Sequence, residues 1–454
     1  MCKWLARFVV LMFLGAATLL AQENLVSLAE AVRRVAERDP GIRAREAERQ
    51  AAQSEARRAE TLRLPKMFLS MDAGGGKLVN DVANVLLTGL TPVSVTDPKT
   101  RSRLAGLSAN RPYLVPGARL ESNLFDGGRA GATIRSAWLG ESKAGVARDR
   151  AREDEAYATA SDFLNLAERR ISSRYLEEYA RVAELAAQAL SAQAKAGRIT
   201  EARALAGQAR FQSAQAALEN NRDDLRLTSD LLRQRAGFPA QTAFDTPPLE
   251  AQLSDFRLAL IPGDGDLEKN SDLLNAELDA RMQEQQVRSS KAARLPELRF
   301  VAEYGFSFSS LLFTFRPGYN VGVRANFPLF TSHETERNIQ SNLRKLDAAS
   351  LKEEKVKSTL REEYARLLAD NRKLGRQLEA ARSQLAQAEE LYRVSRLKYD
   401  QGAGSPADLL EAAELLLNTR ERCLELARSS LELRWTALRL QGGLLAELER
   451  AAQP

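Results

Sequence analysis

The sequence has almost none of the residues that build disulfides or metal sites. Its 454 residues include two cysteines, Cys2 and Cys423, and a single histidine, His333. Cys2 falls in a predicted export signal, so the mature chain keeps one thiol and cannot form an intramolecular disulfide. Cys423 lies in a leucine-rich stretch, which indicates a buried structural thiol. Because a metal site needs several converging ligands, we predict no metal and no cofactor, and we expect His333 to be solvated.

Aromatic residues and catalytic motifs are also scarce. Aromatics make up 6% of the chain, and it has no nucleophile motif, no histidine constellation and no phosphate-binding loop. Its carboxylates lie mainly on predicted helical faces, which argues against an exported carboxylate enzyme. The net charge is +6, but positive and negative residues interleave, and no basic face carries interleaved aromatics. The sequence therefore argues against nucleic-acid binding as well.

Long hydrophobic runs are missing except at the N-terminus. One apolar run, from Phe8 to Leu20, follows Lys3 and Arg7 and ends before Ala21. This order predicts a secretory signal peptide over residues 1–21, since about 13 apolar residues are too few for a membrane anchor helix. With no cysteine near the cleavage point, we predict no N-terminal lipid anchor. No later stretch reaches the length of a transmembrane helix, so any membrane crossing must use strands.

Proline is absent from residues 117–238 and 329–405, so each interval can hold a continuous helix. Both intervals belong to a pattern that occurs twice, with spacings of 25, 72 and 40 residues between its landmarks. Equal spacing in two copies indicates an internal structural duplication. The landmarks are Asp39-Pro40, Leu64-Pro65, Leu124-Phe125, Gly197 and Gly237 in the first copy, and Asn270-Ser271, Leu295-Pro296, Leu329-Phe330, Gly402 and Gly442 in the second.

The spacings predict helix lengths. At 1.5 Å per residue a helix of 72 residues is about 108 Å long, and helices of 40 and 25 residues together reach about 98 Å. Two short helices end to end could therefore line each long one. The predicted organisation is a first repeat over residues 22–237, a proline-rich equatorial linker over 238–267, a second repeat over 268–444 and a short tail over 445–454.

Apolar stripes favour packed helices. One stripe steps by three and four residues before Gly402, and two adjacent columns repeat every seven residues after it, which indicates contact with a helix on each side. An ordinary two-stranded coiled coil would give the same periodicity. The stripe comprises Leu378, Ala381, Leu385, Ala388, Tyr392, Ser395 and Tyr399, and the columns comprise Leu410, Leu417, Leu424, Leu431 and Leu438, and Leu409, Leu416 and Cys423.

Each long helix is predicted to end at a reversal of the chain. After Gly402 and Gly404, Ser405 is the expected N-cap, with Pro406 at the first helical position and Asp408 at the capping-box position. In the first repeat Gly197 and the three residues that follow it have the same role with a weaker cap.

Between the short and the long helix of each repeat the periodicity changes to two. Residues 299–308 and 319–327 alternate apolar and polar side chains, and the first copy does so less clearly, which predicts strand hairpins over about 64–124 and 297–328. Strands with one apolar face are typical of transmembrane β-barrels. Four strands cannot close a barrel, and open edges are not tolerated in lipid, so several copies must contribute. The first hairpin has the longer loop, about 74–111, which we expect to be exposed.

The chain resembles the TolC-like outer-membrane efflux proteins over essentially the whole mature sequence, from Ser27 to Leu444. The most specific portions are residues 388–412, the Asp408–Ala412 run among them, and the Leu-Phe pairs that begin each long helix. The resemblance implies a mainly α fold with a β-barrel portion, in which a homotrimer forms a 12-stranded barrel in the outer membrane of a Gram-negative-type cell and a 12-helix barrel in the periplasm. It also implies a passive exit duct for efflux or type I secretion, which docks with a periplasmic adaptor and an inner-membrane transporter and catalyses nothing.

The resemblance also assigns site residues. Asp408 and Glu411 match positions where the family places acidic rings at the periplasmic entrance. They share a helix face, and a trimer would present six carboxylates, which favour cations. The structural alternative is that Asp408 caps the helix and Glu411 complements its dipole.

Five further residues are assigned to the periplasmic tip and turns. Tyr399 matches a tyrosine that helps to hold the entrance closed, and packing within the apolar stripe is its alternative. Its expected partners are missing: Gly404 stands where better-known members have an arginine, and Arg203 stands at the corresponding acidic position of the first repeat. Gly197 and Gly402 are the expected turn residues.

A periplasmic coiled-coil scaffold without channel activity is the second interpretation of the sequence. It would explain the heptads but not the amphipathic strand pairs between them. The scarcity of histidine and methionine argues only against a dedicated metal-binding path through this component.

Overall fold

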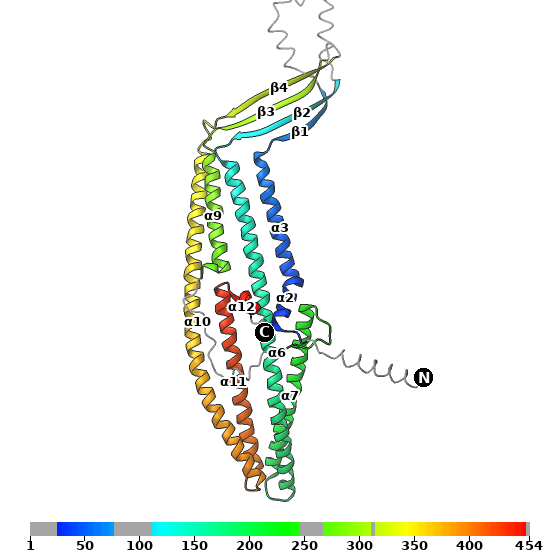
Figure 1. Cartoon of the computed structure of the whole chain (residues 1–454), viewed down its shortest axis with the longest axis vertical. Coiled ribbons are helices and arrows are strands. Elements are labelled where there is room, and N and C mark those ends of the chain that lie inside the picture. Colours follow the sequence, from blue (N-terminus) through cyan, green and yellow to red (C-terminus); the bar gives the residue numbers. More distant parts are fainter. Residues whose placement is uncertain (1–24, 77–110, 246–266, 310–313, 451–454) are drawn as a thin grey trace, which may run out of the picture. The chain divides into compact units, whose positions relative to one another are not determined.

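The computed structural model describes residues 25–76, 111–245, 267–309 and 314–450 (Figure 1). The predicted signal peptide, residues 77–110 of the first hairpin loop, residues 246–266 of the predicted linker and the last four residues of the tail lie outside the described residues. The chain forms two compact units. The strand unit comprises Gln50–Ser142 and Leu278–Leu351, and the helical unit comprises Met1–Arg49, Lys143–Glu277 and Lys352–Pro454.

The predicted duplication is confirmed in the order and length of the elements. The two long helices, α6 and α10, have 67 residues each, the returning helices α7 and α11 have 36 and 35, and the approaching helices α3 and α9 have 21 and 22. The first copy consists of α2 (Leu28–Arg38), α3 (Pro40–Glu60), η1 (Thr61–Arg63), β1 (Lys66–Gly76), β2 (Arg111–Phe125), α6 (Arg129–Lys195) and α7 (Glu201–Ala236). The second consists of η2 (Leu267–Lys269), α9 (Ser271–Ala292), β3 (Glu297–Ser309), β4 (Thr314–Asn326), α10 (Glu334–Asp400), α11 (Pro406–Leu440) and α12 (Leu444–Arg450).

The repeated glycines have a conformational reason. Each of them follows a helix with a left-handed backbone, with φ of 69° and 72° at Gly197 and Gly402 and of 65° and 64° at Gly237 and Gly442. Glycine adopts this region without the steric cost that other residues incur, which is why it ends so many helices. The repeat was thus visible in the sequence because its helices end in the same way.

The polar landmarks before the approaching helices also correspond. The Asp39 carboxylate accepts a hydrogen bond from the Ile42 N–H (2.8 Å), and the Asn270 side-chain oxygen accepts one from the Asp272 N–H (2.8 Å). Both side chains satisfy N–H groups that have no partner in the first helical turn. They therefore fix the starts of α3 and α9.

The strand unit carries one antiparallel sheet in the order β1-β2-β3-β4. The two hairpins join through β2 and β3, where Arg119 pairs with Glu303 and Ala118 with Tyr304. Within the described residues, β1 and β4 are hydrogen-bonded on one side only. Both outer strands therefore present a free edge.

The two faces of this sheet differ in polarity, as predicted. One row of the register runs through Leu69, Ala118, Tyr304 and Tyr319. On this apolar face the side chains of Leu69 and Tyr319 are 86% and 83% exposed. On the other face, Arg119 forms ion pairs with Glu303 (2.8 Å) and Glu121 (3.5 Å), so the second face is polar.

The helical unit packs its helices in the order α7, α6, α11, α10. Leu410 and Leu417 of α11 pack against α6, where they form one apolar cluster with residues such as Tyr179. On its other side, Cys423 of α11 packs with Leu378 and Ala381 of α10. The prediction that α11 contacts a helix on each side is confirmed, and so is the buried structural thiol, whose Sγ donates to the Ala381 carbonyl (3.6 Å).

A ladder of polar contacts fixes α6 and α11 in antiparallel register. Residue numbers rise along α6 while those of their partners fall along α11, so the contacts follow one line between the two helices. The paired side chains are Asp154 with Arg439, Tyr157 with Thr436 (3.3 Å), Ser161 with Glu432 (3.3 Å), Asn165 with Arg428 (2.6 Å), Ser172 with Glu421 (3.0 Å) and Glu178 with Arg420 (2.7 Å).

The start of each long helix requires an unusual backbone. Gly127 and Gly128 before α6 have φ of 68° and 90°, and the corresponding residues before α10, Ser332 and His333, have φ of 46° and 64°. His333 is exposed, as predicted. Within the described residues, the helices lack an apolar stretch long enough to span a bilayer.

Candidate functional site at the helical hairpin turns

The predicted site residues gather at two turns of the helical unit. Residues 196–200 join α6 to α7, and residues 401–405 join α10 to α11 (Figure 1). Gly197 lies in the first turn, Gly402 and Gly404 in the second, and Tyr399 in the last helical turn of α10. Arg203, in the first turn of α7, is exposed. These turns close the two hairpins of helices.

The α10–α11 turn leaves no room for a side chain at Gly404. The N–H groups of Ala403 and Gly404 both donate to the Lys398 carbonyl at 2.9 Å, which folds the turn back on the end of α10. A Cβ at Gly404 would lie 2.8 Å from the Tyr399 backbone nitrogen and 3.0 Å from the Lys398 carbonyl carbon. These are backbone atoms, so a side chain at this position would force the turn to shift, and the arginine expected here from the family resemblance is a glycine in this chain.

We therefore expect Gly404→Ala to destabilise the hairpin. Because the added methyl overlaps the α10 backbone, the free energy of unfolding should fall by about 1–3 kcal/mol, the usual cost of overpacking. The midpoint of thermal unfolding, followed by circular dichroism on the detergent-purified protein, measures this loss. Ala403→Ser, at the exposed neighbouring position, is the control; equal midpoints for the two variants would contradict the tight turn.

The start of α11 is capped as predicted, except at Asp408. The Ser405 hydroxyl accepts a hydrogen bond from the Ala407 N–H (3.1 Å), and Pro406 occupies the first helical turn. The prediction that Asp408 completes a capping box is not met, because its carboxylate makes no hydrogen bond or ion pair with any part of the chain that the structure describes. Its place in the first turn is still favourable for the helix dipole.

Asp408 and Glu411 lie together on an open face of α11. Both residues are exposed, whereas Leu409 and Leu410 between them are buried against α6. Leu415, one turn further on, is 48% exposed. Glu411, like Asp408, is without an ionic partner among the described residues. The two carboxylates are therefore free to interact with charged groups outside the chain.

The Tyr399 side chain packs against apolar residues and makes no hydrogen bond within the described residues. Its ring lies against an apolar cluster contributed by α6, α7 and α11, which includes Tyr179 and Leu410. Burial raises the pKa of the Tyr179 hydroxyl, helped by the negative charge of Glu414 and opposed by Arg210. Arg210 and Glu414 pair across the cluster at 3.6 Å. Charges near the turn thus connect α7 with α11, while Tyr399 supplies apolar contact.

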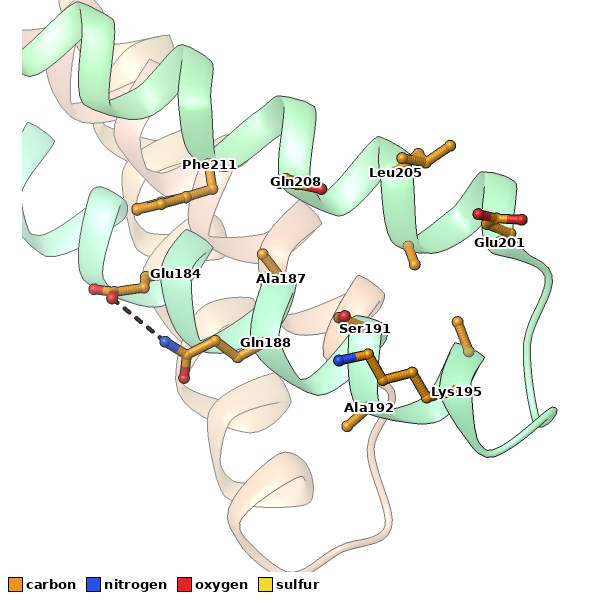
Figure 2. Close-up of a pocket in the computed structure, with 12 residues that line it drawn as sticks. Glu184, Ala187, Gln188, Ser191, Ala192, Lys195, Glu201, Leu205, Gln208 and Phe211 are labelled. Atoms are coloured by element: carbon orange, nitrogen blue, oxygen red, sulfur yellow. Dashed lines mark hydrogen bonds between the residues drawn. The ribbon is translucent and has the colours of Figure 1, made fainter.

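A groove between α6 and α7 lies beside the first turn, with a volume of about 800 Å³ (Figure 2). Lys195 and Glu201 flank its end at the turn, and Phe211 closes the other end, near the Glu184 side chain that accepts a hydrogen bond from Gln188 (3.4 Å). Alanines provide much of its wall. The remaining lining residues are Ala187, Ser191, Ala192, Ala194, Ala204, Leu205 and Gln208.

Sequence reasoning missed this groove, although a signal for it exists. Gly207 is buried in α7, and a Cβ there would lie 2.6 Å from the Leu190 Cδ1 atom. A glycine inside a helix usually costs stability, so its presence indicates a close approach of two helices. Here Gly207 lets α7 lie close to α6 beside Ala187, one of the residues that line the groove.

The comparisons with known proteins agree with the fold. Residues 266–443 match the family model described as outer membrane efflux protein. Among curated proteins, none matches the chain by sequence. The fold is similar to that of the outer membrane protein VceC from Vibrio cholerae, at 19% identity and a TM-score of 0.73 over 92% of this chain and 96% of that one.

Two further solved structures are similar. One is CusC, a protein that forms a transmembrane channel, with 15% identity and a TM-score of 0.74 over 92% of each chain. The Campylobacter jejuni CmeC outer membrane channel has 17% identity and a TM-score of 0.69 over 92% of this chain and 86% of that one. The predicted fold class, a mainly helical chain with a smaller strand portion, is confirmed by the similarity to these structures.

Proposed function

We propose, from the premise that the second repeat of this chain belongs to the outer membrane efflux proteins, that the protein is the exit duct of a tripartite efflux or type I secretion system. It is a channel protein and not an enzyme. Its sheet spans the outer membrane and its helices extend into the periplasm. Cargo passes through it without chemical change.

The apolar sheet face is the observation that carries this proposal. Side chains such as Met67, Leu69 and Tyr319 are between 79% and 86% exposed on it. In water such a face would promote aggregation, whereas in lipid it is the expected surface of a membrane barrel. A periplasmic coiled-coil scaffold would have no use for this face, which is why we favour the duct.

Three copies would complete the barrel. The free edges of β1 and β4 need partners because unpaired backbone groups are not tolerated in lipid, and four strands are fewer than the eight of the smallest barrels. β4 of one copy can pair with β1 of the next until the ring closes. A homotrimer with twelve strands is the proposed assembly, following the resemblance to the family.

The α6–α7 groove supports docking of a periplasmic adaptor. It lies beside the turn of the hairpin and combines a charged end, Lys195 and Glu201, with alanine and leucine walls. A helix of a partner protein could lie along it in the manner of helix-in-groove recognition. The adaptor would in turn connect the duct to an inner-membrane transporter.

Asp408 and Glu411 are the proposed cation-attracting ring of the entrance. Their carboxylates are exposed and unpaired within the described chain, and a trimer would bring six of them around one axis. Rings of carboxylates attract cations in channels. Gly197, Arg203, Tyr399, Gly402 and Gly404 are proposed as the scaffold of the same tip.

Conductance through planar bilayers tests the duct and its ring together. The purified protein should form channels that divalent cations block, and Asp408→Ala with Glu411→Ala should raise the half-blocking concentration about tenfold. That factor corresponds to a loss of about 1.4 kcal/mol in cation binding.

Glu425→Ala is the matched control for the ring, because this residue lies on the same helix but its carboxylate pairs with Arg422 at 2.6 Å. It should leave the block unchanged. An unchanged block in the double variant would remove the ring from the proposal, and a protein that forms no channels would overturn the duct itself.

A further inference from the structure

Two arginines without an ionic partner among the described residues lie where the first repeat passes from helix to strand. Arg63 belongs to η1, just before β1, and Arg135 to the second turn of α6. Both residues are exposed, and neither side chain forms an ion pair or a hydrogen bond within the described chain. Their Nη2 atoms lie 3.0 and 3.9 Å from one point, the position that a Cβ atom of Gly131 would occupy. Two positive charges therefore converge over a residue that has no side chain.

The second repeat has an acid where the first has this glycine. Arg294, the counterpart of Arg63 in the repeated Arg-Leu-Pro sequence, pairs with Glu336 at 3.2 Å. Glu336 follows the Leu-Phe pair of its repeat at the same interval as Gly131 follows the first Leu-Phe pair. The neutral Gln340 occupies the place of the second arginine. Compared with its duplicate, the first repeat thus has one carboxylate fewer and one guanidinium more at this site.

Carboxylates close to the site in sequence are engaged with other donors. The Glu60 side chain, at the end of α3, accepts a hydrogen bond from the Trp138 Nε1 atom at 3.1 Å. The Asp126 side chain accepts backbone hydrogen bonds at the start of α6, including one from the Ala130 N–H at 2.7 Å. Within the described residues, the two converging arginines therefore have no counter-charge, and an anion from outside the chain would supply it.

The arginine pair lies on the side of α6 that is turned away from the polar face of the sheet. Lys66 and Glu121 of that polar face line a pocket together with Arg129 and Thr133 of α6. Gly131 is two residues away from each of these α6 residues, which turns its direction by about 200° around the helix. The pair over Gly131 is therefore on the same side as the apolar face of the sheet.

The pair also lies at the end of this apolar face. Met67 and Leu69, which are largely exposed on the face, follow Arg63 in β1. Trp138, 36% exposed, lies one helical turn after Arg135 in α6. Arginine side chains at the end of a lipid-facing surface extend toward the headgroups, and tryptophan is enriched at the same depth. The surroundings of the two arginines are thus those of a membrane interface.

We propose that Arg63 and Arg135 bind the phosphate of an anionic phospholipid, whose acyl chains lie along the apolar face of β1. This proposal rests on the proposed placement of the sheet in the outer membrane and adds a lipid-binding site to it. Guanidinium groups bind phosphate oxygens through charge-assisted and often bidentate hydrogen bonds. A soluble anion would meet the same arginines but would gain nothing from the apolar face, which is why we assign a lipid.

Quenching of Trp138 fluorescence by brominated lipids tests the site. The Trp435→Phe variant keeps Trp138 as the tryptophan of the predicted mature chain, since Trp4 falls in the predicted signal peptide. This full-length protein is reconstituted in phosphatidylcholine vesicles that contain a rising fraction of brominated phosphatidylglycerol or brominated phosphatidylcholine. Half-maximal quenching should need about tenfold less of the phosphatidylglycerol, because each arginine near the surface favours an anionic lipid.

Gly131→Glu is the critical variant, because it gives Arg63 the carboxylate that Glu336 gives Arg294. It should abolish the preference for phosphatidylglycerol. Gly131→Gln is the matched control, with a side chain of nearly the same size and no charge, and it should keep the preference. Both variants should fold, since the closest atom to a new Cβ is the flexible tip of Arg63.

The outcomes separate the site from its ligand and from the duct. Equal preferences in the two Gly131 variants would overturn the arginine site. Glycerol phosphate, added at the concentration of the phosphatidylglycerol, should leave the quenching unchanged, and release of the lipid by it would overturn the lipid assignment. A wild-type protein that conducts in planar bilayers without any lipid preference would remove the site alone, whereas one that fails to insert would overturn the duct.

Discussion

Leu69→Arg with Tyr319→Arg is expected to remove the protein from the outer membrane. Both residues lie in one cross-strand row on the apolar sheet face, so both guanidinium groups would enter lipid at the same depth. An arginine near the middle of the bilayer costs a barrel about 2–4 kcal/mol. Two in each copy of the proposed trimer would exceed the margin of stability of an ordinary protein. Membrane fractionation and immunoblotting measure the loss.

The matched control places the same charges on the other face. Ser70→Arg and Asn320→Arg change the residues next in sequence, whose side chains point to the polar side of the sheet by the alternation of strands. That side already carries Arg119 and Glu303. This variant should remain in the outer membrane. If both variants insert, or if neither does, the apolar face is not the lipid surface.

Phe163→Ala is expected to have the largest effect in the helical unit. The Phe163 side chain is fully buried in a cluster with Val26, Leu232 and Phe244, and its ring meets that of Phe244 edge to face at 5.4 Å. Loss of a buried phenylalanine costs about 3–5 kcal/mol. Chemical unfolding followed by circular dichroism should show this loss as a lower denaturant concentration at the midpoint.

The position of Phe163 explains why the loss should be so large. Phe244 belongs to the segment after α7, where it bridges to Val26 near the described N-terminus, and the Val26 N–H donates to the Ala243 carbonyl at 3.0 Å. A cavity beneath Phe244 would loosen both segments at once. Leu415→Ala, on the half-exposed face of α11, should change the unfolding free energy by no more than about 0.5 kcal/mol. A small effect of Phe163→Ala would mean that the cluster repacks.

Much of this fold could be predicted because its landmarks follow local rules. Gly197 and Gly402 end their helices with positive φ, Ser405 caps α11 with its own side chain, and the stripe before Gly402 is the buried face of α10. Each of these depends on the chemistry of a few neighbouring residues, which the sequence displays directly. The alternation in β3 and β4 is local in the same sense.

Other features were not revealed by the sequence. Gly404 is excluded from carrying a side chain by the end of α10, and Asp408 does not form the expected capping box. The left-handed backbone of Ser332 and His333 is uncommon for residues other than glycine. The α6–α7 groove depends on how closely Gly207 lets two helices approach. The groove becomes visible only when the two helices are placed side by side.

The most direct test of the duct is the state of the protein after detergent extraction from the outer-membrane fraction. The molecular mass of the protein, measured by light scattering with the detergent subtracted and repeated after heating, should correspond to a heat-resistant assembly of three chains. Such a trimer would complete the barrel that one four-stranded sheet cannot close. A soluble, elongated dimer in the periplasmic fraction would contradict the duct and leave a coiled-coil scaffold as the explanation of the helices.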